Sequence, residues 1–365
     1  MIEFSREPAV PVFPRTRYLT TVCCLMLSLV LVPPRVVGAA GAELYTGEVP
    51  VADQGAAERD RAVPLALEQV LQKLSGLRQF EDYPLVQPAL ERAPALLLSY
   101  HYRNAEYLLA DGSGESQLRL VARFSEPAVD EMARALQLPL WQPDRPPLTL
   151  WLVVDQGFER RIMPIEYVYV KQALDDVAER RGLPLRWPEP GPDGEYAVDL
   201  QLLWGGYTEE LAADGNAGVL IAAARREGPE WSVRMNLDYQ GRHQAFRLND
   251  IDLQAALATG LQDIVDQVAT EDSIAAADLG NWSQELVVGG LNGPADYLRC
   301  LNYLQGISIV DQVDVVSARP GTVTFRLGLA ALPDYLEQSL ASGGILARVD
   351  PDGDFELMPE APNDG

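Results

Sequence analysis

Lysine, histidine and cysteine are nearly absent from this sequence. Its 365 residues include two lysines, Lys73 and Lys171, two histidines, His101 and His243, and three cysteines. Because the histidines are far apart and no HExxH pattern occurs, a zinc hydrolase is not indicated. The sequence also lacks a GxSxG elbow, a Walker A loop and a GxGxxG loop, which disfavours the enzyme classes that depend on them. We therefore assign no catalytic, cofactor-binding or metal-binding residue.

The few residues that could carry chemistry have simpler interpretations. His101 alternates with tyrosines in "SYHYR", as in a strand, and Cys300 in "DYLRCLNYL" is expected to be a buried small apolar residue of a helix. The acidic run "DPDGDFE" (350–356) has glycine at its fourth position, not at the sixth as in an EF-hand loop. Neighbouring carboxylates at 175–176 and 209–210 do not face each other on a helix. We expect all these carboxylates to be solvated.

Acidic residues greatly outnumber basic ones. The formal net charge is −24, which disfavours binding to a nucleic-acid backbone or to an anionic membrane surface. We therefore expect no nucleic-acid partner. The apolar fraction of 47% is ordinary for a globular protein and is enough to form a real core.

The N-terminus has the pattern of a secretory signal peptide. Three arginines within the first 17 residues precede the apolar run "LTTVCCLMLSLVLV" (19–32), and "AGA" (40–42) fits a small-x-small cleavage site. The run is shorter than the ~20 residues that a helix needs to span a bilayer. We expect a signal peptide over residues 1–42, cleaved near Ala42, and a periplasmic protein without membrane insertion. An uncleaved signal that anchors the protein in the inner membrane is the alternative.

The rest of the chain predicts an α/β (α+β) protein made of small mixed-sheet units in series. An N-terminal α/β unit is expected over 43–145, a central α/β unit over 146–272 and a C-terminal unit over 281–350. A polar linker over 270–280 separates the last two, and 351–365 reads as an acidic disordered tail. The C-terminal unit has the order β-α-β-β-α-β, which is the ferredoxin-like pattern.

Local signals place several elements inside these units. Gly76 is expected to end the first helix in a left-handed conformation, Pro64 to kink that helix or mark its start, and Asp53 to cap it. The turn signal "DGSGE" joins two strands. The segment from Val198 to Trp204 reads as another strand.

The stretch "LQLPLWQPDRPPLTLWLVVD" (136–155) could be an active site or a joint between two units. Its prolines force extended backbone before a continuous apolar run, which is typical of a strand buried on both faces. No histidine, serine or cysteine lies nearby for the charged pair to activate. We expect a local turn and a surface ion pair from that charged pair. The predicted structural joint consists of Trp141, Asp144, Arg145, Pro146 and Trp151.

Two separated segments resemble a known family. "LYTGEVPVADQGAAERDRAVPLALEQVLQKLSG" followed by "LPLWQPDRPPLTLWLVVD" is similar to the DUF2066 family of uncharacterised proteobacterial exported proteins. The resemblance runs from about residue 43 to 350. It implies an exported envelope protein and supplies no catalytic residues.

These observations leave three functional hypotheses. The first is a non-enzymatic binding or assembly module in the periplasm, whose partner is an envelope protein or a cell-wall component. The second is a carboxylate-based cell-wall glycan hydrolase, which needs two acidic side chains facing each other across a cleft. The third is a structural subunit that oligomerises through strand edges.

Overall fold

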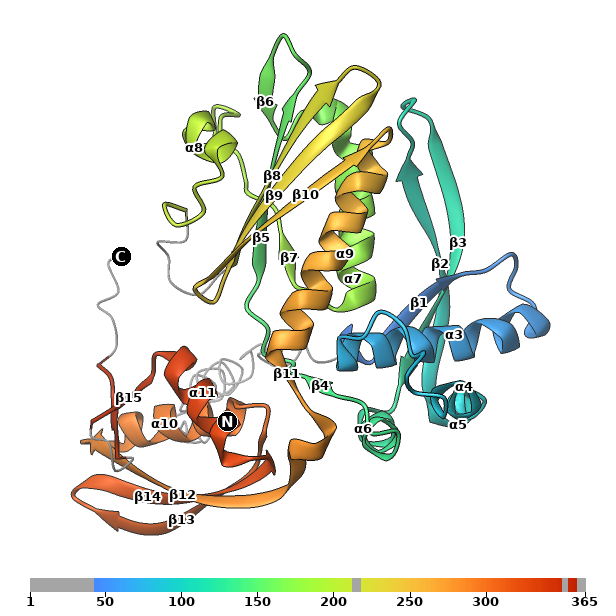
Figure 1. Ribbon diagram of the computed structural model, residues 1–365. Coiled ribbons are helices and arrows are strands. Elements are labelled where there is room, and N and C mark those ends of the chain that lie inside the picture. Colours follow the sequence, from blue (N-terminus) through green and yellow to red (C-terminus); the bar gives the residue numbers. More distant parts are fainter. Residues whose placement is uncertain (1–42, 212–217, 350–353, 360–365) are drawn as a thin grey trace, which may run out of the picture. The chain divides into compact units, whose positions relative to one another are not determined.

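The computed structural model describes residues 43–211, 218–349 and 354–359 (Figure 1). The expected signal peptide lies outside these residues. The described chain is a mixed α/β protein with several small mixed sheets in series, as the sequence predicts. Its buried apolar residues form three large clusters, here called the N-terminal, central and C-terminal cores, and one small cluster on the second face of the central sheet.

The first sheet has three antiparallel strands in the order β1–β3–β2. One of its faces packs against helices to form the N-terminal core, in which Leu67, Leu120 and Phe124 are fully buried. Gly76 ends α3 at φ 70°, and its N–H donates to the Gln72 carbonyl, as predicted. The elements are β1 (Thr46–Pro50), α3 (Ala56–Ser75), α4 (Val86–Leu90), α5 (Ala93–Leu96), β2 (Leu97–Leu108), β3 (Gly114–Phe124) and α6 (Glu126–Ala135).

The start of α3 differs from the expectation. Its N-cap is Gly55, and the Asp53 carboxylate instead accepts the Gly55 N–H at 2.7 Å. Pro64 lies inside the helix rather than at its start.

The central sheet has the order β10–β9–β8–β5–β6, with β7 beside β5. Strand β8 runs parallel to β5 and antiparallel to β9, so the sheet is mixed. The elements are β4 (Leu140–Trp141), β5 (Leu148–Asp155), β6 (Arg160–Ile162), η1 (Ile165–Tyr167), α7 (Val168–Arg181), β7 (Leu185–Arg186), α8 (Leu200–Gly205), β8 (Gly218–Glu227), β9 (Glu230–Tyr239), β10 (Arg242–Asp250) and α9 (Leu253–Asp272).

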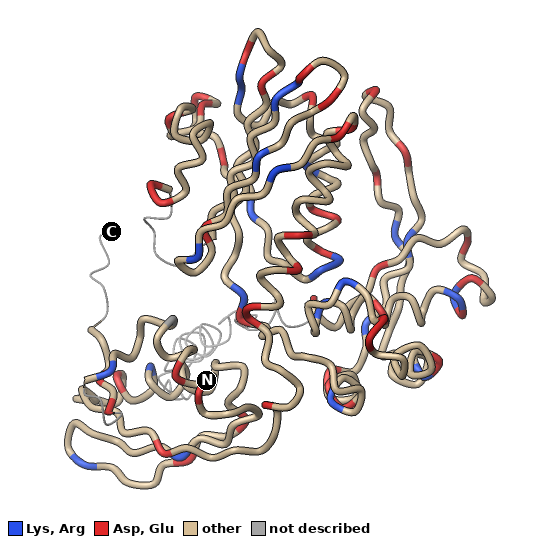
Figure 2. The backbone as a smooth tube through the Cα atoms, in the orientation of Figure 1, with Lys and Arg blue, Asp and Glu red and all other residues tan. Residues whose placement is uncertain are grey.

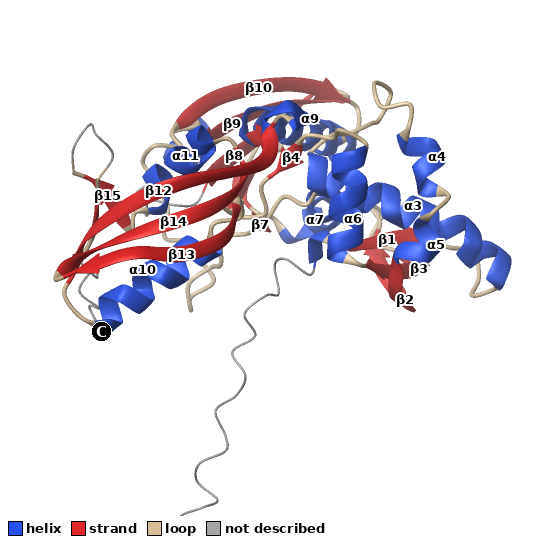
Figure 3. Ribbon diagram, turned by 90° about the horizontal axis from the view of Figure 1, so that it is seen from below, coloured by secondary structure: helices blue, strands red, loops and turns tan. Residues whose placement is uncertain are grey.

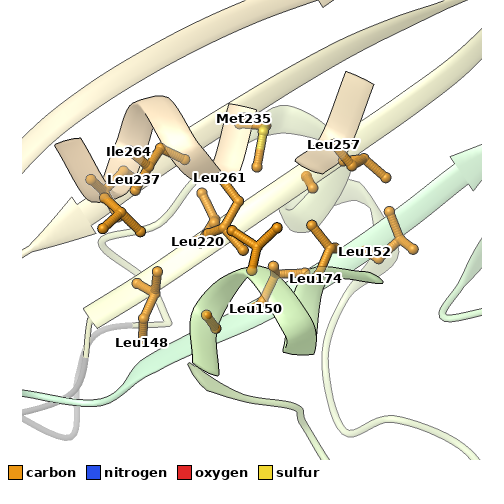
Figure 4. Packing of buried hydrophobic residues seen from close by; sticks show 14 of the residues in the cluster. Leu148, Leu150, Leu152, Leu174, Leu220, Met235, Leu237, Leu257, Leu261 and Ile264 are labelled. Carbon is orange, nitrogen blue, oxygen red and sulfur yellow. The ribbon is translucent and has the colours of Figure 1, made fainter. Parts of the chain in front are cut away.

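Alternation along the strands divides the central sheet into two faces. Leu148, Leu150 and Leu152 of β5 point toward α7 and α9, where they meet Leu174 and Leu261 in the central core (Figure 4). The next residues along β5 point to the opposite face, because successive strand side chains alternate. Helix α8 covers part of that second face through Leu203.

Helix α8 corrects the strand predicted over 198–204. The Asp199 carboxylate accepts the Gln201 N–H and caps the helix at its start. Leu203 and Trp204 then pack onto the sheet. A segment as short as this one fits a strand and a short helix equally well, and the cap residue decides between them.

The C-terminal sheet has the order β13–β14–β12–β16–β15. Its long strands β13, β14 and β12 lie side by side in Figure 3. Helices α10 and α11 lie on one side of the sheet (Figure 1) and close the C-terminal core around Cys300, Phe325 and Leu336. The elements are β11 (Ser273–Ile274), η2 (Ala276–Asp278), β12 (Leu279–Leu291), α10 (Pro294–Gly306), β13 (Val310–Arg319), β14 (Gly321–Ala331), α11 (Pro333–Gly343), β15 (Leu346–Arg348) and β16 (Phe355–Leu357).

Two sequence-based boundaries are wrong in this region. Phe355–Leu357 form β16, parallel to β12 and antiparallel to β15, so the tail over 351–365 is not wholly disordered. Strand β16 stands between β12 and β15. The expected linker over 270–280 holds the end of α9, β11 and a 3-10 turn, and the side chain of Ile274 is fully buried.

Within the described ranges, no helix is long and apolar enough to cross a membrane.

Candidate functional site

The segment around β4, residues 138–145 and here called the β4 segment, contributes to all three cores. Leu138 is buried in the N-terminal core, Leu140 packs against the C-terminal core and Trp141 is buried in the central core. The strand also pairs with β11, with Trp141 opposite Ser273 and Leu140 opposite Ile274. Four residues of chain therefore hold three separate cores together.

Arg145 is the polar centre of this segment. Its side chain is buried and its guanidinium group lies 3.7 Å from the Trp141 ring centre. It donates to four backbone carbonyls: Nε to Gln142 at 2.8 Å, Nη1 to Gly182 at 2.5 Å, and Nη2 to Lys73 at 2.6 Å and to Trp141 at 2.9 Å. These carbonyls come from the end of α3, the segment before Arg145 and the end of α7. Burial lowers the pKa of Arg145 to about 9, so the group stays charged at neutral pH.

The other predicted joint residues lie in different places. The Pro146 carbonyl accepts the Tyr239 hydroxyl at 3.1 Å, and Asp144 accepts the Ser308 N–H from the C-terminal unit. The expected surface ion pair between Asp144 and Arg145 is wrong, because the Arg145 donors turn inward to carbonyls. Trp151 does not pack this joint either: it lies on the second face of the central sheet, near Tyr196.

That second face carries a group of four arginines, here called the arginine face: Arg160, Arg225, Arg234 and Arg247. The register of the five strands places them in two neighbouring rows. Across β6–β5–β8–β9–β10, the first row is Arg160, Asp155, Arg225, Ser232 and Asn249, and the second row is Ile162, Val153, Ala223, Arg234 and Arg247. Basic segments are visible on these strands in Figure 2.

Asp155 and Trp204 hold the first row in place. The Asp155 Oδ2 atom is 3.1 Å from Arg160 Nη2 and 3.2 Å from Arg225 Nη2. The Gly157 N–H and then these two arginines keep the pKa of Asp155 below its ordinary value, so its charge is retained. The guanidinium groups also lie 3.8 Å and 5.0 Å from the Trp204 ring centre. The aromatic ring and one carboxylate thus fix two cations side by side.

The second row has no carboxylate. Arg234 donates to the Trp204 carbonyl, and its Nε atom is buried without a hydrogen-bond partner among the described residues. Arg247 is exposed, stands directly opposite Arg234 and forms no ion pair within the described ranges. Glu227 and Glu230 follow one row further out on the same face, at the β8–β9 turn, and no salt bridge joins them to the four arginines in the described structure.

A shallow hollow of about 610 Å³ lies along α9 and is lined by Asp263, Asp266 and Glu271. These carboxylates are already engaged. Asp266 accepts Arg181 Nη2 at 2.6 Å, and Glu271 pairs with Arg242 at 3.0 Å. Because arginines pair with these carboxylates, this hollow does not favour the glycan hydrolase hypothesis.

Among the scarce residue types, Lys73 meets the β4 segment through its backbone carbonyl, which accepts from Arg145. One histidine lies beside the arginine face. His101 is exposed on β2. His243 lies at the edge of the second face, with its Nδ1 atom 3.5 Å from Asp238 Oδ2 and its Nε2 atom 3.8 Å from Glu209. Cys300 is fully buried, and burial raises the pKa of its thiol to about 11. Only Asp354 of the three aspartates in the acidic run lies within the described residues.

Sequence reasoning missed the arginine face. Its four arginines are spread over almost ninety residues and four strands, and only the strand register brings them together. One signal was available: Ser232, Arg234 and Asn236 alternate with apolar residues along β9, which places Arg234 on the face opposite the central core.

A comparison with protein-family models found a match over one part of the chain. A family model described as a domain of unknown function (DUF8605) matches residues 39–142, and the resemblance to DUF2066 is therefore wrong. No curated protein sequence matches the chain. A crystal structure of an uncharacterized protein aligns with 34% of this chain and 91% of its own length, at 13% identity and a TM-score of 0.17, a likeness too low to support an argument. The first part of the chain thus resembles a domain of unknown function that ends within the segment joining the three cores.

Proposed function

We propose that this protein is an exported, non-enzymatic binding module of the cell envelope that holds an acidic envelope component against the arginine face. The observation that carries the proposal is the gathering of four arginines in two rows of one sheet face, in a chain whose net charge is −24.

Like charges directly opposite each other on a sheet destabilise it. Arg234 and Arg247 are such a pair, and Arg225 is a diagonal neighbour of Arg234, about 7–8 Å away by sheet geometry. An anionic ligand would relieve this repulsion. Arginine suits the role, because its planar fork binds carboxylate and phosphate groups through two parallel hydrogen bonds.

The proposed location follows from the N-terminal pattern of arginines, apolar run and small residues. Thiol counting in urea tests it together with N-terminal sequencing. Cleavage near Ala42 removes Cys23 and Cys24 and leaves only Cys300, so the exported protein should titrate one thiol. Three thiols and an intact Met1 in a membrane fraction would contradict the cleavage.

Co-sedimentation of the purified protein with isolated cell envelopes tests the binding role. Binding should weaken as salt rises to about 0.5 M, because salt screens exposed charges. The Arg247→Glu variant should bind envelopes more weakly than the parent protein at the same salt concentration. Arg226→Glu is the matched control, since Arg226 neighbours Arg225 on β8 but points to the opposite face. Equal binding by the two variants would remove the arginine face from the proposal.

A further inference from the structure

We infer that Arg234 and Arg247 form the centre of a site for a phosphate monoester, such as the phosphoryl group of a phosphorylated sugar. This inference rests on the proposed function and names the chemistry of its ligand.

The charge distribution singles out the second row. Asp155 already satisfies part of Arg160 and Arg225 through one shared oxygen. Arg234 and Arg247 stand directly opposite each other on neighbouring strands, so their Cβ atoms are about 5 Å apart. The two guanidinium groups can therefore both reach one small anion bound between them. Among the described residues, no carboxylate forms an ion pair with Arg234 or Arg247.

The donors of this row favour a phosphoryl group over a carboxylate. Arg234 spends one Nη2 donor on the Trp204 carbonyl and its Nε is buried, which leaves its other guanidinium N–H groups and the exposed Arg247 fork for a ligand. Two forks present more N–H donors than the two oxygens of one carboxylate can accept with good geometry. A phosphate monoester offers three oxygens and close to two negative charges at neutral pH, which match two cations.

Neighbouring polar groups can bind the remainder of the ligand. Ser232 and Asn249 lie opposite each other in the adjoining row on the same face. Their hydroxyl and amide groups both donate and accept hydrogen bonds, which suits the hydroxyls of a sugar. The exposed Glu227 and Glu230 at the β8–β9 turn would repel a second anionic group beyond that row.

The overall charge favours a phosphorylated sugar of the envelope, rather than a lipid surface, as the source of this group. A membrane rich in anionic lipids presents a whole field of charge, which repels a chain of net charge −24. A single phosphorylated sugar presents only one anionic group and meets the local positive potential.

Isothermal titration of the purified protein with glucose 6-phosphate at low salt tests the site. We expect saturable binding, weakened about tenfold or more by Arg247→Gln, because a charge-assisted hydrogen bond is lost. Arg247→Gln should fold normally, since Arg247 is exposed and unpaired among the described residues. Arg234→Gln should weaken binding as well, and circular dichroism checks its fold. Arg226→Gln should bind like the parent.

Several results would overturn the inference. Equal affinity for glucose and glucose 6-phosphate would exclude recognition of the phosphoryl group, and parent-like binding by Arg247→Lys would exclude the arginine fork. Binding to phosphatidic acid vesicles without binding to the sugar phosphate would show a lipid ligand and overturn the sugar as the source of the phosphoryl group.

The envelope assay separates this inference from the proposed function. Envelope binding that depends on Arg247 but is not competed by glucose 6-phosphate would refute the phosphoryl site and keep the binding role. Envelope binding that ignores Arg247 would refute both.

Discussion

Replacing Arg145 with methionine should destabilise the protein by about 4 kcal/mol. The substitution keeps an apolar stem but removes the donors to four backbone carbonyls. A buried carbonyl that loses its partner costs about 1–3 kcal/mol, and the four costs overlap because the carbonyls share one site. Loss of the contact with the Trp141 ring adds about 1 kcal/mol. Removal of the desolvation cost of the charge offsets part of the total.

Urea unfolding followed by tryptophan fluorescence and by circular dichroism measures this loss. With a slope of about 2.5 kcal/mol per M, the midpoint should fall by about 1.5 M. The two probes should also separate, since Arg145 bonds to the ends of both α3 and α7 and its loss should let the cores unfold in steps. Arg134→Met is the matched control, because Arg134 is exposed on α6 and should change stability by less than about 0.5 kcal/mol. A midpoint shift for Arg145→Met no larger than that of the control would refute the role of the four carbonyls.

Three further predictions concern packing, reactivity and pH. Trp141→Ala should cost about 3–5 kcal/mol in urea unfolding, because the ring is 1% exposed in the central core; Asp144→Ala should cost about 1 kcal/mol, and equal costs would contradict the packing argument. The native Cys300 thiol should resist Ellman's reagent at pH 8, since a pKa of about 11 leaves roughly 0.1% thiolate, and rapid labelling without urea would contradict its burial. The pKa of Asp155 is held below its ordinary value, so its charge stabilises the fold above about pH 4 and this contribution is lost as the pH falls further. The stability difference between the parent and Asp155→Asn should therefore narrow between pH 7 and pH 3, and a constant difference would exclude the ion pairs as its source.

Local signals predicted much of the fold. Glycine at 76 ends α3 because a residue there must adopt positive φ. The mixed α/β class and the C-terminal β-α-β-β-α-β order also follow from such local patterns. They depend only on residues close together in the sequence.

The errors come from interactions between distant residues. Strand β16 gains its place from pairing with β12, almost seventy residues earlier, and its short sequence carries no such information. Arg145 looked like a surface residue beside Asp144, yet its partners come from α3 and α7. The net charge of the chain likewise suggested little affinity for anions, although the strand register gathers four arginines on one face. The net charge of a chain does not show where on the folded surface its charged side chains lie.

Because the β4 segment contacts all three cores, it determines which fragments of this chain can fold when they are expressed separately. A fragment that ends at residue 142, where the family match stops, carries Leu140 and Trp141 without the two cores that cover them. Such a fragment should aggregate or require a surrogate partner when expressed alone. A fragment that starts after this segment leaves a matching gap in the central core, where the Trp141 ring belongs. Successful dissection requires the β4 segment to be supplied in trans, so that separately expressed pieces reassemble around it by complementation.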